Sequence, residues 1–231
     1  MSETDNDQTI RLNKFIATHS GISRREADDL IATQQVSLNG QIAQLGSRYN
    51  LGDQVHIKDE PLQILQETTT ILFHKPAGYV CSRRQQGDSP TIYSLLPADL
   101  QRLKTVGRLD RDSSGLLLLT DDGDLTHRLT HPKFHKQKTY EVRLDSNLQP
   151  LHHQMINDYG VMLEDGKSQL SLVRPEEGNH QFWQVLMHEG RNRQIRRTFA
   201  ALGYGIKSLH RTSFGSYQLG SLASGKYTNI N

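Results

Sequence analysis

The 231-residue chain contains a single cysteine, Cys81, and no long apolar run. One thiol excludes an internal disulfide framework and any metal site built from several cysteines. No apolar stretch approaches ~18 residues, so we expect no membrane-spanning helix. The first ten residues lack the positive charge and apolar core of a signal peptide. These absences predict a cytoplasmic protein.

Sequence signals for a cofactor are also lacking. No complete phosphate-binding sequence of the G-x-x-x-x-G-K-S/T or G-x-G-x-x-G type occurs. The histidines at 127, 131 and 135 have the spacing of helical zinc ligands, but Pro132 interrupts that helix and the glutamate of H-E-x-x-H is missing. The acidic turn at 121–124 is too short for a calcium loop. We therefore expect neither a metal ion nor an organic cofactor.

The net charge of +2 averages over an uneven distribution. Without the three acids among the first nine residues, 27 basic residues stand against 22 acidic ones, or +5. Residues 188–211 hold six Lys/Arg and one acid, and residues 11–25 hold four basic residues and no acid. Such clusters are typical of polyanion-binding proteins, although a solvated charged face explains a single cluster equally well.

The patterns predict four segments: a disordered tail over 1–9, a small module over 10–58, a linker over 59–68 and a larger domain over 69–231. In the module, helical spacing at 12–16 precedes the capping box Ser23-x-x-Glu26, and Asn39-Gly40 predicts a hairpin turn. From Thr69 onward strand patterns dominate, notably at 71–73, 116–119, 138–144 and 181–187. The expected fold class is α+β.

Asp110 is the first candidate for chemistry. It lies between Arg108 and Arg111, directly before a glycine-containing turn into an apolar strand. Arginines keep a carboxylate ionised, and an ionised carboxylate in an apolar pocket can act as a nucleophile or a base. From spacing alone, a surface Arg–Asp network is the more frequent explanation.

Two further groups are candidates. Lys138 and Tyr140 point to the same side of an expected strand, where the phenol could stack on a base or exchange a proton. An ordinary core tyrosine is the commoner case. Arg193, Arg196 and Arg197 form one stripe of a basic helix expected over 191–202. They require an anionic partner, either phosphate or a carboxylate elsewhere in the protein.

Taken together, these motifs resemble RsuA-type ribosomal RNA pseudouridine synthases. They occur in the family's order: Lys75-Pro76-x-Gly78, Gly107-Arg108-Leu109-Asp110, Ser114-Gly115 with residues 116–120, Asp122-Gly123, Lys138-x-Tyr140 and Glu189-Gly190-Arg191 with residues 192–197. Residues 11–14, 23–25, 39–40 and 52–53 resemble an RNA-binding module named after a small-subunit ribosomal protein. The resemblance covers about residues 10–220. It implies a small α/β RNA-binding module followed by a mixed, mainly antiparallel sheet domain.

The resemblance implies isomerisation of a uridine to pseudouridine, in which the base is flipped out, cut from the ribose, turned and rejoined through carbon. Asp110 would attack the sugar or remove its 2′ proton, and Arg196 would pair with Asp110. Tyr140 would stack on the uracil and take the proton from its carbon 5, while Arg108 helps to displace the nucleotide. Further substrate contacts are expected from Lys138, Arg191, Arg193 and Arg197, and RNA contacts from Arg11, Lys14, Ser23, Arg24 and Arg25. No cofactor is implied.

The expected partner is ribosomal RNA or a pre-ribosomal particle, bound by a monomer without membrane contact. Residues 11–14 and 23–28 favour large-subunit ribosomal RNA, with small-subunit ribosomal RNA or tRNA as alternatives. The second hypothesis is a non-catalytic RNA-binding ribosome-assembly protein, against which the intact Asp110, Tyr140 and Arg196 argue. A nuclease is disfavoured because the sequence lacks a carboxylate cluster for metal.

Overall fold

The computed structural model describes residues 9–64, 68–84 and 86–230. The chain divides into two compact units, Met1–Thr68 with Asp121–Gly123, and Thr69–Thr120 with Asp124–Asn231. Residues 1–8 of the expected tail and residues 65–67 of the expected linker lie outside the described part. Within the described part, no helix combines the length and the apolar character needed to cross a membrane.

The first unit packs two helices on short strands around a small core. Gly21, with φ of 76°, ends the first helix, and the core includes Leu12, Phe15 and Ile31. The helices are α1 (Leu12–Ser20) and α2 (Arg24–Ala32). The strands are β1 (Ile10–Arg11) paired with β4 (Arg48–Tyr49), and an antiparallel sheet in the order β3 (Gln41–Ile42), β2 (Val36–Leu38), β5 (Val55–Ile57) and β6 (Glu60–Pro61).

Local sequence signals in this unit are confirmed. The Ser23 hydroxyl accepts a hydrogen bond from the Glu26 amide at 3.1 Å, and the Glu26 carboxylate accepts one from the Ser23 amide at 2.6 Å. This is the expected capping box, and it begins α2. Asn39 and Gly40 both have positive φ, 52° and 78°, as a two-residue hairpin turn of type I′ requires.

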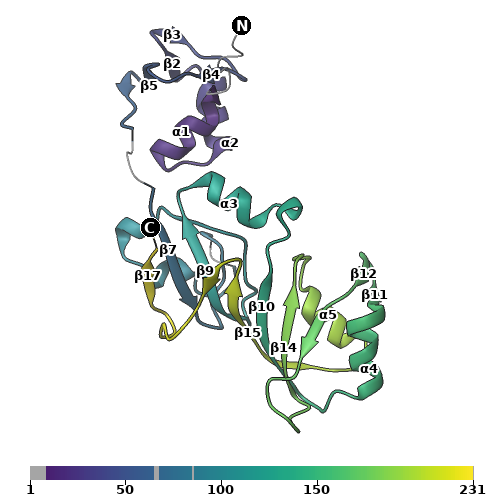
Figure 1. The fold of residues 1–231 in the computed structure, drawn as a ribbon. Coiled ribbons are helices and arrows are strands. Elements are labelled where there is room, and N and C mark those ends of the chain that lie inside the picture. Colours follow the sequence, from purple (N-terminus) through teal and green to yellow (C-terminus); the bar gives the residue numbers. More distant parts are fainter. Residues whose placement is uncertain (1–8, 65–67, 85, 231) are drawn as a thin grey trace, which may run out of the picture. The chain divides into compact units, whose positions relative to one another are not determined.

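The second unit is built on a nine-stranded sheet (Figure 1). Its main path runs β13–β14–β10–β15–β9–β7–β17, with β16 on β15 and β8 on β9. Among the described strand pairs, only β15 and β9 run parallel. The strands are β7 (Thr70–Lys75), β8 (Lys104–Thr105), β9 (Ser114–Thr120), β10 (Lys138–Leu144), β13 (Ser171–Val173), β14 (Phe182–Met187), β15 (Ile206–Phe214), β16 (Tyr217–Gln218) and β17 (Tyr227–Asn229), with a separate hairpin of β11 (Val161–Leu163) and β12 (Gly166–Ser168). The expected α+β class, with a mixed and mainly antiparallel sheet, is confirmed.

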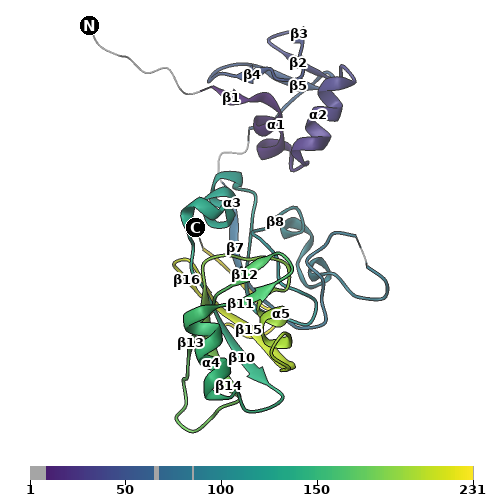
Figure 2. The same ribbon diagram turned by 90° about the vertical axis from the view of Figure 1, so that its right-hand side faces the viewer.

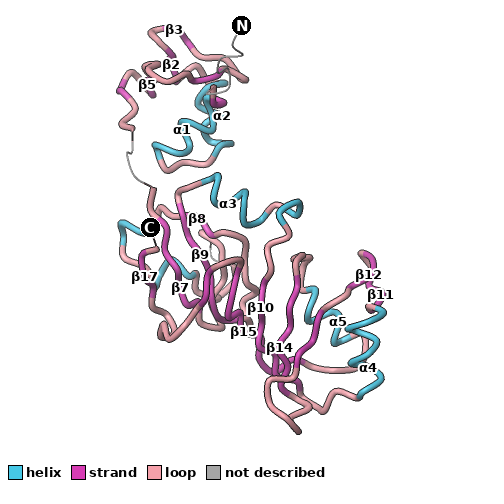
Figure 3. Tube along the Cα trace, viewed as in Figure 1, coloured by secondary structure: helices cyan, strands magenta, loops and turns pink. Residues whose placement is uncertain are grey.

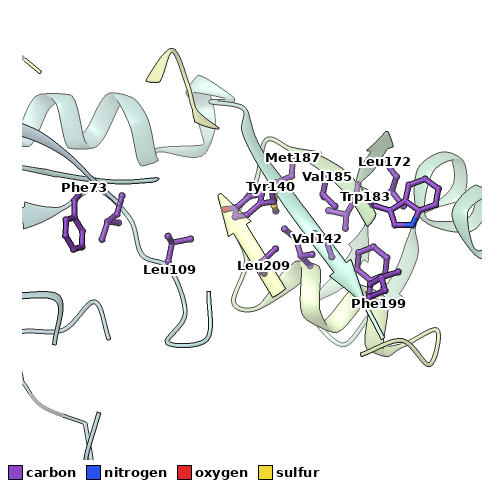
Figure 4. Packing of buried hydrophobic residues seen from close by; sticks show 14 of the residues in the cluster. Phe73, Leu109, Tyr140, Val142, Leu172, Trp183, Val185, Met187, Phe199 and Leu209 are labelled. Atoms are coloured by element: carbon purple, nitrogen blue, oxygen red, sulfur yellow. The ribbon is translucent and has the colours of Figure 1, made fainter. Parts of the chain in front are cut away.

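Helices cover one part of this sheet. Figure 2 shows α4 and α5 beside β13, β14 and β10. Phe199 of α5 belongs to the same buried cluster as Val142 and Val185 of the sheet, as Figure 4 illustrates. The helices are α3 (Gly123–Thr130), α4 (Pro150–Gln154) and α5 (Gln194–Ala200), with the 3₁₀ helices η1 (Ile92–Leu95), η2 (Ala98–Leu100) and η3 (Pro132–Phe134) and the π-helix η4 (Met155–Tyr159).

The helix expected over 191–202 is shorter than predicted. It begins only at Gln194, because Arg193 adopts a left-handed conformation with φ of 47° and ψ of 30°. A non-glycine residue in this region carries backbone strain that surrounding contacts must hold. The side chain of Arg193 is thereby placed at the start of α5 and not along its stripe.

Asp110 lies in an irregular segment. Figure 3 shows that much of the chain between β7 and β9 is loop, with only short elements. Residues 106–113 connect β8 to β9, and the Ser113 amide donates to the Asp110 carbonyl at 3.1 Å to close a turn. This turn directly precedes the buried strand β9 and puts the Asp110 side chain at one wall of a cavity.

Candidate active site

A cavity of about 1090 Å³ lies in the second unit. Its walls come from the Asp110 loop, the end of α3 with the segment after it, strands β10 and β15, and the start of α5. The expected residues that line it are Arg108, Asp110, Lys138, Tyr140, Arg191, Arg193 and Arg196. Arg197 is not among the lining residues. The fold therefore brings the Asp110 motif, the Lys138-x-Tyr140 motif and the arginine-rich motif at 189–197 to one cavity.

Asp110 is flanked by two arginines. Its Oδ2 lies 3.6 Å from Arg193 Nη1 and 4.0 Å from Arg196 Nε, and its side chain is 30% exposed. The two guanidinium groups thus lie within ion-pair distance of a half-buried carboxylate. The sequence left open whether the arginine stripe contacts phosphate or a carboxylate of the protein. For Arg193 and Arg196 the partner is the Asp110 carboxylate.

Arg196 also supports the turn that carries Asp110. Its Nη2 donates to the Asp112 carbonyl at 3.0 Å and to the Ser113 hydroxyl at 3.3 Å. Burial lowers the pKa of Arg196, and neighbouring Arg193 adds to this, while Asp110 and Asp112 oppose it. A guanidinium keeps its proton in spite of such a shift, so Arg196 is a permanent cation beside Asp110.

Tyr140 is buried on β10, opposite Val185 of β14 and Arg211 of β15. In Figure 4 its hydroxyl points away from Trp183, toward the side where Leu109 is drawn. Lys138 is two residues earlier on the same face. The Tyr140 ring therefore gives the cavity a flat aromatic surface, and its hydroxyl points away from the buried cluster around Trp183.

Lys138 is held at the cavity by one backbone contact. Its Nζ donates to the Glu189 carbonyl at 3.2 Å. Burial lowers the pKa of Lys138, and the charge of Arg211 lowers it further, while Glu189 raises it. Lys138 and Arg211 are therefore two neighbouring cations that both line the cavity.

Two arginines of the predicted set have a different anionic partner. Asp165 accepts from Arg191 Nη1 at 2.9 Å and from Arg197 Nη2 at 2.7 Å. The hydrogen bond from Arg197 is the main cause of the lowered pKa of Asp165, and it raises the pKa of Arg197 in turn. This network ties α5 to the β11–β12 hairpin.

Lys75 is a residue that the sequence did not single out as part of the site. It is fully buried at the end of β7, and its Nζ donates to the carbonyls of Ser113 at 2.7 Å, Pro76 at 2.9 Å and Arg111 at 3.3 Å. Burial lowers its pKa to about 8. The sequence signal was the Lys75-Pro76-x-Gly78 motif, which does not by itself reveal these acceptors.

The predicted RNA-binding residues of the first unit lie at the start of its two helices. Arg11 precedes α1 and is exposed, as are Arg24 and Arg25 in the first turn of α2. Ser23 is the N-cap of α2, and Lys14 lies in α1. Arg24 Nη2 also donates to the Asn13 side chain at 3.2 Å.

Comparison with known proteins places both units in families. Residues 69–201 match the model of RNA pseudouridylate synthase, and residues 10–55 match the S4 domain. The chain is 35% identical over 224 residues to the ribosomal small subunit pseudouridine synthase A of Pasteurella multocida, covering 96% of each chain. It is 34% identical over 223 residues to the ribosomal large subunit pseudouridine synthase B of Bacillus subtilis, covering 93% of this chain and 89% of the relative.

A solved structure gives the same result. The chain is similar to a crystal structure of a pseudouridylate synthase, with a TM-score of 0.67 and 36% identity over 96% of both chains. The matched family model spans more than half of the chain and includes Asp110, Tyr140 and Arg196. The chain therefore belongs to the RNA pseudouridylate synthase family and is an RNA pseudouridine synthase with an N-terminal S4 domain.

Proposed function

We propose that the protein converts a specific uridine of ribosomal RNA to pseudouridine without a cofactor, with Asp110 acting on the sugar. One observation supports this above all. The Asp110 carboxylate, flanked by Arg193 and Arg196, lines the same cavity as the buried Tyr140. A carboxylate paired with guanidinium groups suits attack or proton removal, and a buried phenol suits stacking and proton exchange on an extruded base.

The reaction needs only these groups. Asp110 attacks the sugar carbon that carries the base or removes its 2′ proton. In either case the glycosidic bond breaks and its electron pair leaves with the uracil. The base turns and its carbon 5 bonds to the sugar carbon. This step breaks the ester bond to Asp110 if the carboxylate attacked, or is accompanied by return of the proton from Asp110 to the 2′ carbon if it acted as a base. Tyr140 takes the proton from carbon 5, and the freed ring nitrogen gains a proton. The net change is an isomerisation, so no oxidant, reductant or external nucleophile is consumed.

The remaining cations are proposed to hold RNA. Arg108, which is exposed at the cavity, helps to displace the target nucleotide, and Lys138, Arg191 and Arg193 contact it. Arg197 acts with them through the Asp165 network. Residues 10–58 form the RNA-binding module, with Arg11, Lys14, Ser23, Arg24 and Arg25 at its RNA face, and the catalytic domain spans 69–231. Of the linker expected over 59–68, Glu60–Pro61 pair with β5 as β6 and extend the sheet of the module. We further propose that the protein acts as a monomer in the cytoplasm.

The target is proposed to be large-subunit ribosomal RNA, from the residues at 11–14 and 23–28. Small-subunit ribosomal RNA is the second candidate. It is favoured by the relatives from Pasteurella multocida and Haemophilus influenzae, which carry the small-subunit name and align over 96% and 94% of this chain.

Transcriptome-wide pseudouridine mapping in cells with and without the protein tests the proposal. Loss of one pseudouridine from large-subunit ribosomal RNA is the expected result. Loss of a site from small-subunit ribosomal RNA would establish the second candidate. If every pseudouridine persists, the enzymatic proposal is wrong for ribosomal RNA, and a role as an RNA-binding assembly protein takes its place.

A further inference from the structure

Arg211 is a buried cation at the cavity that the mechanism above does not use. It lies on β15, lines the cavity and is only 2% exposed. Its Nε donates to the Leu116 carbonyl on β9 at 2.8 Å. The two strands approach closely at this point because Gly115 lacks a Cβ: an added Cβ would lie 2.2 Å from the Arg211 carbonyl oxygen.

The guanidinium of Arg211 is incompletely satisfied. Its Nη2 is buried and has no hydrogen-bond partner among the described residues, and no described carboxylate forms a salt bridge with it. Its Cζ lies 5.0 Å from the centre of the Phe214 ring, a contact that offsets only part of the lost solvation. Burying a guanidinium without an anionic partner costs folding free energy. The unpaired Nη2 of Arg211 therefore points to a hydrogen-bond acceptor supplied by a ligand.

The surroundings of Arg211 are cationic and aromatic. Tyr140 is directly opposite on β10, so that both side chains face the cavity side of the sheet. Lys138 approaches the same Phe214 ring, at 5.3 Å from its centre. The charge of Arg211 lowers the pKa of Lys138, which is the sign expected for two cations that share a poorly solvated region. A ligand atom with negative or partial negative charge in this region would stabilise both cations.

We propose that Arg211 donates a hydrogen bond from its unpaired Nη2 to a ring carbonyl of the target uracil and stabilises the negative charge that the base acquires when the glycosidic bond breaks. This role rests on the proposed pseudouridine formation. Whether Asp110 attacks the sugar or removes its 2′ proton, the bond pair departs on the ring nitrogen and spreads to the two carbonyl oxygens. A preorganised donor in a dry pocket acts most strongly on such developing charge.

A base fits this position better than a phosphate. The donor is buried and lines the cavity together with Leu109, Tyr140 and Phe214, whose apolar and aromatic side chains suit a flat ring. A phosphodiester would have to carry two riboses and a hydrated charge past these side chains. The exposed Arg108 and Arg193 are more accessible to phosphate.

The test uses RNA substrates that carry uridine, 2-thiouridine or 4-thiouridine at the target position. Single-turnover rates and the steady-state kcat and KM are measured for the wild type, Arg211→Lys and Arg211→Gln. Arg143→Gln is the matched control, because Arg143 also packs on a ring, Phe182 at 4.4 Å, but does not line the cavity. Thermal unfolding and RNA binding are recorded for each protein to show that it is folded.

We expect Arg211→Gln to lower kcat by about 10²-fold, as loss of an oxyanion-stabilising donor does, with little change in KM. Arg211→Lys should recover part of this loss. Sulfur is a poor hydrogen-bond acceptor, so replacing the carbonyl oxygen that Arg211 contacts should slow the wild type. For one of the two thio substrates, the fold decrease in rate should be at least about tenfold larger for the wild type than for Arg211→Gln. Comparing the two ratios cancels the intrinsic effect of sulfur on the leaving base.

Equal thio effects in wild type and Arg211→Gln at both positions overturn the role of Arg211, as does an unchanged kcat. If instead a methylphosphonate beside the target loses its effect only in Arg211→Gln, the ligand is a phosphate and the proposal is wrong. These outcomes leave pseudouridine formation by the wild type intact. Absence of pseudouridine from wild-type reactions on every ribosomal RNA fragment would refute the proposed function itself.

Discussion

Lys75 Nζ donates a hydrogen bond of 2.7 Å to the carbonyl oxygen of Ser113, on the turn that carries Asp110. The same ammonium donates to the Arg111 carbonyl, and Arg196 donates to the Asp112 carbonyl. Three consecutive backbone acceptors are thus held by two cations. The turn that presents the candidate carboxylate is clamped by charge and not by regular secondary structure.

The buried Lys75 predicts a pH-dependent stability. Its pKa is about 8 in the folded protein against 10.5 for an unperturbed lysine. Between these values the unfolded chain binds the proton that the folded chain has lost, so stability rises with pH in this window, and the full penalty is present below it. Relative to Lys75→Met, the wild type should gain on the order of 3 kcal/mol of unfolding free energy from pH 7.5 to 10.5.

Urea unfolding at a series of pH values measures this difference. The exposed Lys207→Met provides the control, for which no such trend against the wild type is expected. A constant difference between wild type and Lys75→Met across the window would show that Lys75 is not buried as a cation.

Asp110→Asn should abolish pseudouridine formation while RNA binding survives. The amide keeps the size of the side chain but cannot act as nucleophile or base. Product is measured in ribosomal RNA fragments, and binding is measured by titration at fixed salt. Full activity of Asp110→Asn would remove Asp110 from the chemistry.

Tyr140→Phe should bind RNA normally but form product much more slowly. The ring proposed to stack on the base is kept, whereas the hydroxyl proposed to take the proton from carbon 5 is lost. Single-turnover assays that follow cleavage of the original nucleoside and appearance of pseudouridine separate the two stages. An unchanged rate would leave Tyr140 with a stacking role only.

Gly115→Ala should destabilise the protein by about 3 kcal/mol, the combined scale of backbone strain and overpacking. Gly115 has φ of 107°, and an added Cβ would lie 2.2 Å from the Arg211 carbonyl oxygen and 2.6 Å from its nitrogen. The control is Gly123→Ala, where a Cβ meets nothing within 4 Å and φ is not positive. Chemical denaturation should show only a small change for that variant, and similar losses for both would contradict the close strand approach.

Local features were predictable because their causes are local. The capping box of Ser23 and Glu26 satisfies amides within one helical turn, and the Asn39-Gly40 turn depends on two residues with positive φ. The strand patterns at 71–73, 116–119 and 138–144 correspond to β7, β9 and β10. The start of α5 was predicted wrongly because no residue type at 191–193 indicates the left-handed conformation of Arg193.

The candidate site was predictable in its members but not in their pairings. Asp110, Tyr140 and Arg196 were expected from the motifs, and they line one cavity. Whether an arginine would meet Asp110 or Asp165 depends on how the β11–β12 hairpin and the Asp110 loop approach α5. The role of Lys75 as a clamp depends likewise on a strand pairing between β7 and β9.

The amino-acid sequence by itself determined the capping box, the hairpin turn, several strands, the α+β class and the family, since these follow from short-range periodicity and from motifs in a set order. Only the tertiary structure decided which charges neutralise one another and which remain unpaired. Arg211 illustrates the difference. In the sequence it is one of six cations between 188 and 211, and only the sheet, through the close approach at Gly115, buries it without an anionic partner among the described residues. Burial and pairing arise from segments distant in the chain, so no local pattern encodes them.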